Sequence, residues 1–297
     1  MIKYMMYLTL DSSENVVAFV VSKQGQHLLV TYELETNKLT TLFSTDSTIS
    51  SVAWLHESLY FVHNCMLIQV DVNTQQQTEL FQCEQLQQFS DDAFVFLQRG
   101  NIICFNVTSR EQQIIATEVD SLIATKGEII VFKKAGAIYY WLQGELYELT
   151  VSFEVLSAAL SFDEQYIAFF GTQLGAKQLF VYDIELQILQ NMTEMLGATI
   201  GHDGVESSLP TLSLEIPAWT ETNAFYFLVS ANDEVRLYYG DLYGTLLPAS
   251  PEDECIYDYV IARSGNWAIT AFTGKDGQCQ LVVLDITTGE QSTIEIY

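Results

Sequence analysis

The chain has 297 residues, of which 49% are hydrophobic and 17% are charged, with only 4 prolines. This composition excludes a disordered or collagen-like chain, and the length allows one large domain or two small ones. There are 12 Lys and Arg against 38 Asp and Glu, a net charge of −26. That balance argues against nucleic acid and anionic membrane surfaces as partners, because both bind clustered cations.

Five cysteines are scattered along the chain at Cys65, Cys83, Cys104, Cys255 and Cys279. Their number is odd and no C-x-x-C pair occurs, so the pattern favours reduced thiols over a disulfide framework. The N-terminal residues read as a strand rather than a signal peptide, because polar residues follow a short apolar run at once. We therefore expect a cytoplasmic protein. No apolar run approaches the about 20 residues of a membrane helix.

Short runs rich in Val, Ile, Leu, Phe and Tyr recur along the chain, and turn residues interrupt them every few positions. This spacing predicts an all-β fold. Residues 49–81 show the repeating unit most clearly, with four successive strands separated by turns. The one short helical candidate lies near residues 190–196.

Grouping the strands in fours gives seven units of the length typical of propeller blades. We predict a single domain over residues 1–297, a seven-bladed β-propeller of four-stranded antiparallel blades. A large β-sandwich or a six-bladed ring is the alternative. The predicted blades cover, in chain order, residues 3–43, 49–81, 86–116, 119–149, 154–192, 212–248 and 256–297.

An insertion interrupts the repeat between Gln190 and Pro217, and a segment of that length is either functional or simply exposed. Its polar residues His202, Asp203 and Glu206 are candidates for contact with a substrate or partner. Arg236 is a fourth candidate, because it is one of few cations in an acidic chain. The alternatives are a solvated loop for the insertion and a cross-strand ion pair for Arg236.

No known catalytic motif is found: the chain has no G-x-S-x-G, no H-E-x-x-H and no P-loop. His56, His63 and Cys65 lie near one hairpin, but a fourth ligand is missing, so blade-edge positions are favoured over a zinc site. We predict no catalytic, cofactor-binding or metal-binding residues. Blade-to-blade packing explains four tryptophans better than a ligand cage does: Trp54, Trp141, Trp219 and Trp267.

Two blades carry a more specific pattern. Residues 158–170 and 179–184 resemble the "S-x-D-G-x-x-I-A-F … L-x-V-x-D" blade of prolyl oligopeptidase-family propellers and their Tol-type relatives, without the turn glycine. Residues 217–244 resemble the "P-x-W-x-x-D … Y-F-x-x-S … L-Y-x-x-D-x-x-G" blade, with Thr222 in place of the first Asp. Within the family, the chain looks most similar to the propeller of acylaminoacyl peptidases.

The resemblance implies an N-terminal propeller that covers a C-terminal α/β-hydrolase domain and restricts access to short peptides. None of the family's catalytic residues can be placed here, so we expect this chain alone not to be an enzyme. Its partners would be the hydrolase domain and peptide substrates. The alternatives are a standalone propeller that binds a protein partner, and an enzyme with a metal or acidic channel site, which a chelator would reveal.

Overall fold

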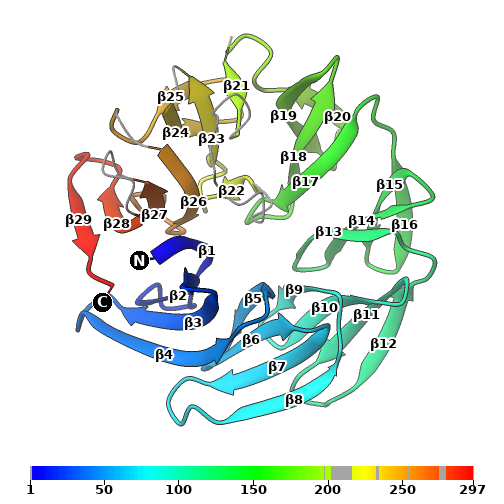
Figure 1. Cartoon of the computed structure of the whole chain (residues 1–297). Coiled ribbons are helices and arrows are strands. Elements are labelled where there is room, and N and C mark those ends of the chain that lie inside the picture. Colours follow the sequence, from blue (N-terminus) through cyan, green and yellow to red (C-terminus); the bar gives the residue numbers. More distant parts are fainter. Residues whose placement is uncertain are drawn as a thin grey trace. The chain divides into compact units, whose positions relative to one another are not determined.

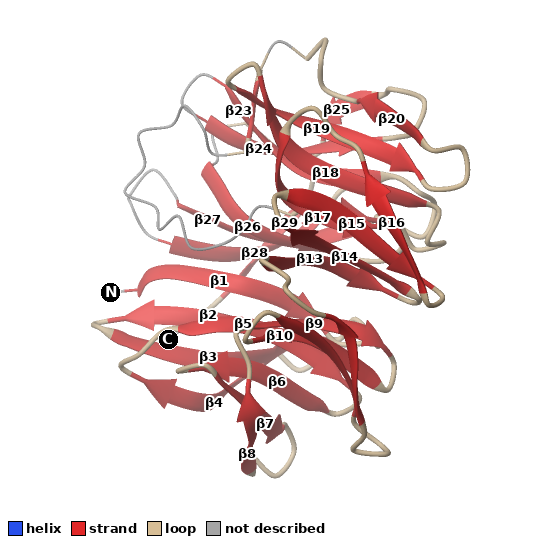
Figure 2. Cartoon of the chain, turned by 90° about the vertical axis from the view of Figure 1, so that its right-hand side faces the viewer, coloured by secondary structure: helices blue, strands red, loops and turns tan. Residues whose placement is uncertain are grey.

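The computed structural model describes residues 2–196, 198–201, 216–231, 234–252, 255–273 and 279–296, with only the main chain at residues 2–4. In this part of the chain all regular structure is β-strand (Figure 2). It contains no helix long and apolar enough to cross a membrane. The predicted all-β class is therefore confirmed.

Consecutive strands pair in antiparallel sets of four along residues 2–149 (Figure 1). The first sheet is β1 (Ile2–Leu10), β2 (Val16–Lys23), β3 (Gln26–Glu33) and β4 (Lys38–Thr45). The second is β5 (Ile49–Leu55), β6 (Ser58–His63), β7 (Met66–Asp71) and β8 (Gln77–Gln82). The third is β9 (Gln85–Ser90), β10 (Ala93–Gln98), β11 (Asn101–Asn106) and β12 (Gln112–Ala116). The fourth is β13 (Ser121–Lys126), β14 (Ile129–Lys134), β15 (Ala137–Leu142) and β16 (Glu145–Leu149).

The C-terminal half continues the pattern with one variation. The fifth sheet is β17 (Glu154–Leu160), β18 (Tyr166–Gln173), β19 (Ala176–Asp183) and β20 (Ile188–Asn191). The sixth is β21 (Thr199–Ile200), β22 (Ala218–Trp219), β23 (Phe225–Ala231), β24 (Glu234–Gly240) and β25 (Leu246–Pro248). The seventh is β26 (Cys255–Ile261), β27 (Trp267–Thr273), β28 (Cys279–Asp285) and β29 (Gln291–Ile294). One parallel pair, Val235 with Cys255, joins the last two sheets.

By internal contacts the chain divides into two compact units. One comprises residues 7–151; the other comprises residues 152–297 together with residues 1–6. In the second unit, the backbone N–H of Met5 donates a hydrogen bond to the Tyr257 hydroxyl at 3.2 Å, and Met5 is fully buried. Burial raises the pKa of the Tyr257 hydroxyl, which therefore stays protonated.

The second strand of each sheet forms the core. In β10, Phe94, Val95 and Phe96 are all 0% exposed, so both faces of the strand are covered. A strand buried on both faces needs a continuous apolar run rather than alternation, which is the pattern that these segments show. This is why they are the easiest elements to find in the sequence.

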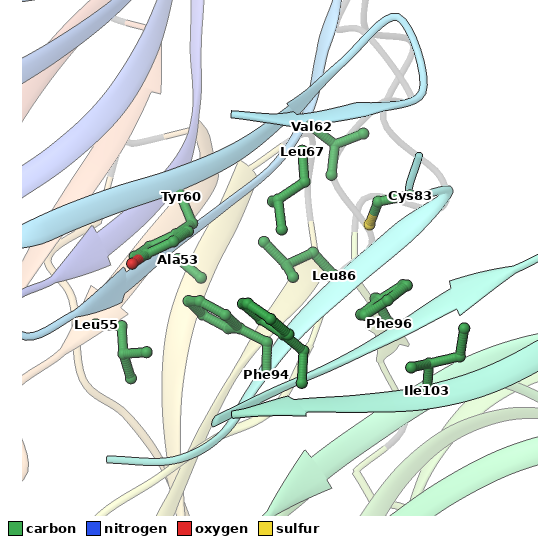
Figure 3. Packing of buried hydrophobic residues seen from close by; sticks show 11 residues of the cluster. Ala53, Leu55, Tyr60, Val62, Leu67, Cys83, Leu86, Phe94, Phe96 and Ile103 are labelled. Atoms are coloured by element: carbon green, nitrogen blue, oxygen red, sulfur yellow. The ribbon is translucent and has the colours of Figure 1, made fainter. Parts of the chain in front are cut away.

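One cluster shows how neighbouring sheets pack (Figure 3). Tyr60 of β6 lies against Phe94 of β10, with ring centroids 4.5 Å apart. Phe81 stacks on Phe96 at 4.6 Å and meets Phe105 edge-on at 5.0 Å. These offset and edge-to-face contacts are the geometries that aromatic rings prefer. The second and third sheets are thus joined by aromatic side chains rather than by a backbone ladder.

In four of the sheets, the turn between the third and fourth strands is closed by the same kind of side-chain hydrogen bond. An Asp or Asn at the end of the third strand accepts a hydrogen bond from the backbone N–H three residues later: Asp71 from Thr74, Asn106 from Ser109, Asp183 from Leu186 and Asp285 from Thr288, all at 2.7–2.9 Å. Such side-chain bonds imitate a backbone turn. The Asp or Asn that ends each of these strands therefore has a structural role.

The short helical candidate near residues 190–196 does not form a helix. β20 runs through Asn191, and residues 192–196 form turns. Thr193 is buried, and its hydroxyl accepts the backbone N–H of Leu179 at 2.9 Å, while the Asn191 side chain accepts the Thr193 N–H at 3.0 Å. Side chains that bond nearby backbone in this way compete with helix formation.

Candidate functional site

The first strand of the sixth sheet is broken into two pieces. β21 pairs with the end of β23, Thr199 with Ser230 and Ile200 with Val229. β22 pairs with the beginning of β23, Ala218 with Tyr226 and Trp219 with Phe225. β21 and β22 therefore occupy one strand position beside β23, with the insertion between them in the sequence. The sixth blade, predicted to start at residue 212, makes its first ladder pairs at residue 199.

Both ends of this insertion are fastened to the sheet. The Gly201 N–H donates to the Leu228 carbonyl at 2.7 Å, and the buried Ser230 hydroxyl donates to the Gly201 carbonyl. At the other end, the Tyr259 hydroxyl lies 2.7 Å from the Ile216 carbonyl and 3.0 Å from the Tyr226 carbonyl. We call these residues the insertion root. The Ser230 and Tyr259 hydroxyls bond to backbone carbonyls, so they hold the main chain at the two ends of the insertion.

Tyr226 connects the insertion root to the seventh sheet by a hydrogen bond. The Tyr226 hydroxyl donates to the Gly265 carbonyl at 2.9 Å, and the residue is 3% exposed. Burial, with a smaller contribution from Tyr239, raises its pKa to about 12. The hydroxyl is therefore a permanent hydrogen-bond donor at physiological pH rather than an acid or base.

Arg236 lies two strands from the insertion, because Val229 pairs with both Ile200 and Arg236. Its guanidinium donates to the Ser250 carbonyl at 2.8 Å and lies 3.5 Å from a Glu252 carboxylate oxygen. The ion pair expected for Arg236 is thus present, but its partner lies in the link between β25 and β26 rather than on a neighbouring strand. This cation braces the link between two sheets.

The other predicted contact residues, His202, Asp203 and Glu206, lie outside the described residues, and their role stays a prediction. The residues considered for a metal site do not converge. His56 bonds to Asp92 at 3.1 Å, and His63 bonds to the Thr45 hydroxyl at 3.0 Å. Across the described ranges, no group of three or more His, Cys, Asp or Glu is arranged to hold a metal ion.

Two tryptophans join neighbouring sheets, as predicted. The Trp54 indole N–H donates to the Thr9 carbonyl at 3.3 Å, and that of Trp219 donates to the Ala159 carbonyl at 3.1 Å. Both side chains are buried. Trp141 and Trp267 are more exposed. Trp54 and Trp219 therefore occupy equivalent joints rather than a ligand cage.

Sequence reasoning missed the residues that fasten the insertion. Ser230 is the serine of the Y-F-x-x-S blade pattern, but that pattern does not reveal its bond to Gly201, and no motif marks Tyr259. Their role depends on which carbonyl lies opposite them, and only the strand pairing shows this. The presence of a long insertion was the one usable signal.

No family model matches the chain, and no curated protein matches it significantly. Solved structures do. The chain is similar to the β-propeller domain of the Trilobed protease from Pyrococcus furiosus, with a TM-score of 0.73 and 14% identity over 100% of this chain and 99% of that one. It is similar to Pyrococcus horikoshii acylaminoacyl peptidase, with a TM-score of 0.70 and 14% identity over 99% of this chain and 52% of that one.

TolB from Acinetobacter baumannii is a more distant match, with a TM-score of 0.54 and 18% identity over 79% of this chain and 64% of that one. The chain spans about half the length of the acylaminoacyl peptidase that it matches. At these identities the likeness establishes the fold. The chain has a β-propeller fold of four-stranded antiparallel sheets, similar to that of acylaminoacyl peptidase and of prolyl endopeptidases.

Proposed function

We propose that this chain is the propeller part of an acylaminoacyl-peptidase-like protein, and that it restricts and contacts peptide substrates for a hydrolase domain outside these 297 residues. One observation carries the proposal: nearly all of this chain aligns with about half of a peptidase. The Trilobed protease propeller, which aligns over its whole length, supports the same division into parts.

The described residues favour a supporting role over chemistry in this chain. At the insertion root the Ser230 and Tyr259 hydroxyls bond to backbone carbonyls, and two strands away the Arg236 guanidinium bonds to the Ser250 carbonyl, so these groups position main chain. In this proposal the chain needs no cofactor and has no peptidase activity by itself. A cytoplasmic location belongs to the proposal and is supported by the five scattered cysteines.

The test uses native protein captured from its source with an antibody raised against this chain. The captured material is treated with a biotinylated fluorophosphonate, which labels activated serine nucleophiles, and with an acylated peptide substrate. We expect a labelled polypeptide that contains peptides of this chain, and cleavage that the label abolishes. The recombinant 297-residue chain is the matched control and should show neither.

A second candidate is a standalone propeller that binds a protein partner. The similarity to TolB favours it, because that match extends over 64% of the TolB chain rather than half of it. In that case the captured protein would carry no fluorophosphonate label and would release no product from the acylated peptide. A bound partner protein at fixed stoichiometry would then replace the hydrolase as the functional unit.

A further inference from the structure

The fifth and sixth sheets expose large apolar side chains at turns where the repeat otherwise places polar ones. Leu186 follows Asp183 by three residues and is 65% exposed. Thr74, Ser109 and Thr288 occupy the same place after Asp71, Asn106 and Asp285, with the same backbone bond. The turn therefore does not require an apolar residue, and the leucine is a departure within the chain's own repeat.

Tyr243 departs in the same way in the next sheet. Its N–H donates to the Asp241 carboxylate at 2.9 Å, and its side chain is 97% exposed. Thr287 makes the corresponding bond to Asp285 at 2.8 Å. A second bond from the Thr245 N–H to Asp241, also at 2.9 Å, fixes this turn. The phenol is thus presented to solvent on a rigid support.

Tyr166 connects the two turns. It pairs with Asp183 in the ladder, and its ring lies over Trp219 with centroids 6.2 Å apart. Burial raises the pKa of its hydroxyl first, and the nearby charges of Asp183, Asp163 and Glu185, together with the Tyr243 phenol, raise it further. Tyr166, Leu242 and Leu246 also pack against one common cluster. We call Tyr166, Leu186 and Tyr243 the turn surface.

The charged residues within the turns of the fifth and sixth sheets that surround the turn surface are all acidic. The turns at residues 161–166, 183–188, 220–224 and 241–245 contain no Lys or Arg. Their acidic residues are Asp163, Glu164, Asp183, Glu185, Glu221 and Asp241. Asn223 donates to the Asp163 carboxylate at 2.6 Å and ties the turns of the two sheets together. A second copy of this chain would bring like charges together, which costs free energy at an interface.

We propose that the turn surface is a docking site for a basic protein segment in which Lys or Arg stands beside an aromatic or aliphatic side chain. The face of an exposed phenol ring attracts a cation, here the Lys or Arg of the bound segment. Leu186 would pack against the neighbouring apolar side chain of that segment. The surrounding carboxylates steer the cationic segment and exclude acidic ones. The turn surface shares no residue with the insertion root.

The test measures fluorescence anisotropy of a labelled dodecapeptide in which Arg and Phe alternate with Gly and Ser. The variant carries Leu186→Thr and Tyr243→Thr, which are the residues that the chain itself uses at the equivalent turns. Ile114→Thr is the matched control, because Ile114 is 61% exposed on β12 in another sheet. Two comparison peptides replace Arg by Glu or Phe by Ser.

We expect the double variant to weaken binding about tenfold and Ile114→Thr to leave it unchanged. Both comparison peptides should bind more weakly than the first. Raising salt from about 0.01 to about 0.15 M should weaken binding, because the Debye length falls from about 30 to about 8 Å. Equal affinity for wild type and double variant would overturn the proposal. Self-association of the wild type that the double variant abolishes would also overturn it, in favour of a second copy.

Discussion

The joint between the fifth and sixth sheets depends on the Trp219 indole. Its N–H donates to the Ala159 carbonyl at 3.1 Å, and its ring meets Phe225 edge-on at 5.3 Å. Trp219→Phe keeps an aromatic ring in the site and removes the donor. The substitution therefore separates the hydrogen bond from most of the packing.

The expected loss of stability follows from these contacts. A net hydrogen bond contributes about 1 kcal/mol, and a carbonyl left unpaired adds to that cost. The smaller ring also leaves part of the indole volume unfilled in a site that is 5% exposed. Together these effects predict that Trp219→Phe lowers the free energy of unfolding by about 2 kcal/mol. Trp54→Phe should act in the same direction with a somewhat smaller effect, since its bond is longer at 3.3 Å.

Urea unfolding followed by far-ultraviolet circular dichroism measures this difference as a shift of midpoint at constant slope. Trp267→Phe is the control, because its side chain is only partly buried. It should change stability by less than about 1 kcal/mol. An equal loss in the control and in Trp219→Phe would refute the assignment of Trp219 to a sheet-to-sheet joint.

Three other predictions concern turns and thiols. Hydrogen bonds from Thr74 lower the pKa of the Asp71 carboxyl. The stability that this carboxylate contributes is therefore present above its unfolded pKa and is lost as pH falls through its folded pKa. In the Asp71→Asn variant the melting temperature should therefore fall less steeply as the pH is lowered. An unchanged dependence of melting temperature on acid pH would contradict this. Gly25→Ala should lower the free energy of unfolding by about 1 kcal/mol, because the backbone there has a positive φ and nothing else opposes a Cβ. Gly265→Ala should lower it more, because its Cβ would also lie 2.9 Å from a Thr220 methyl group. A lower urea midpoint for Gly25→Ala than for Gly265→Ala would contradict this. Burial raises the pKa of the Cys83 thiol to about 12, whereas Cys65 is exposed. Iodoacetamide at mildly alkaline pH should therefore modify Cys65 well before Cys83, as followed by peptide mass spectrometry. Faster labelling of Cys83 would contradict its buried position.

The sequence allowed the repeat to be recognised because burial leaves a simple trace in it. Strands such as β10 and β18 are covered on both faces, so they read as uninterrupted apolar runs between turn residues. Propeller blades repeat this run at a regular period, and the period predicted the fold. The late-blade motifs then predicted the likeness to peptidase propellers that the solved structures show.

The broken strand of the sixth sheet could not be found in this way. β21 and β22 have two residues each, which is too short for any periodicity. Their pairing is fixed by distant carbonyls and by the Ser230 and Tyr259 hydroxyls, and these contacts leave no local pattern. The partner of Arg236 was missed for the same reason, because Glu252 lies in a link whose path the sequence does not reveal.

The exposed apolar turn residues could be seen in the sequence, but their role could not be predicted from it. Leu186 and Tyr243 are visible in the sequence at turn positions, but an exposed apolar residue is common and by itself uninformative. Their meaning comes from aligning the turns by the Asp or Asn that closes each one. That alignment becomes secure only when the hydrogen bonds show which residues are equivalent.

The central claim is that this propeller works with a hydrolase domain, and the intact mass of the native polypeptide tests it most directly. The chain has a mass of 33.6 kDa and matches 52% of an acylaminoacyl peptidase. Protein captured from its source and measured by mass spectrometry should have about twice the mass of this chain and should contain a G-x-S-x-G sequence. A native mass of 33.6 kDa, with no serine hydrolase bound at equal stoichiometry, would contradict the claim.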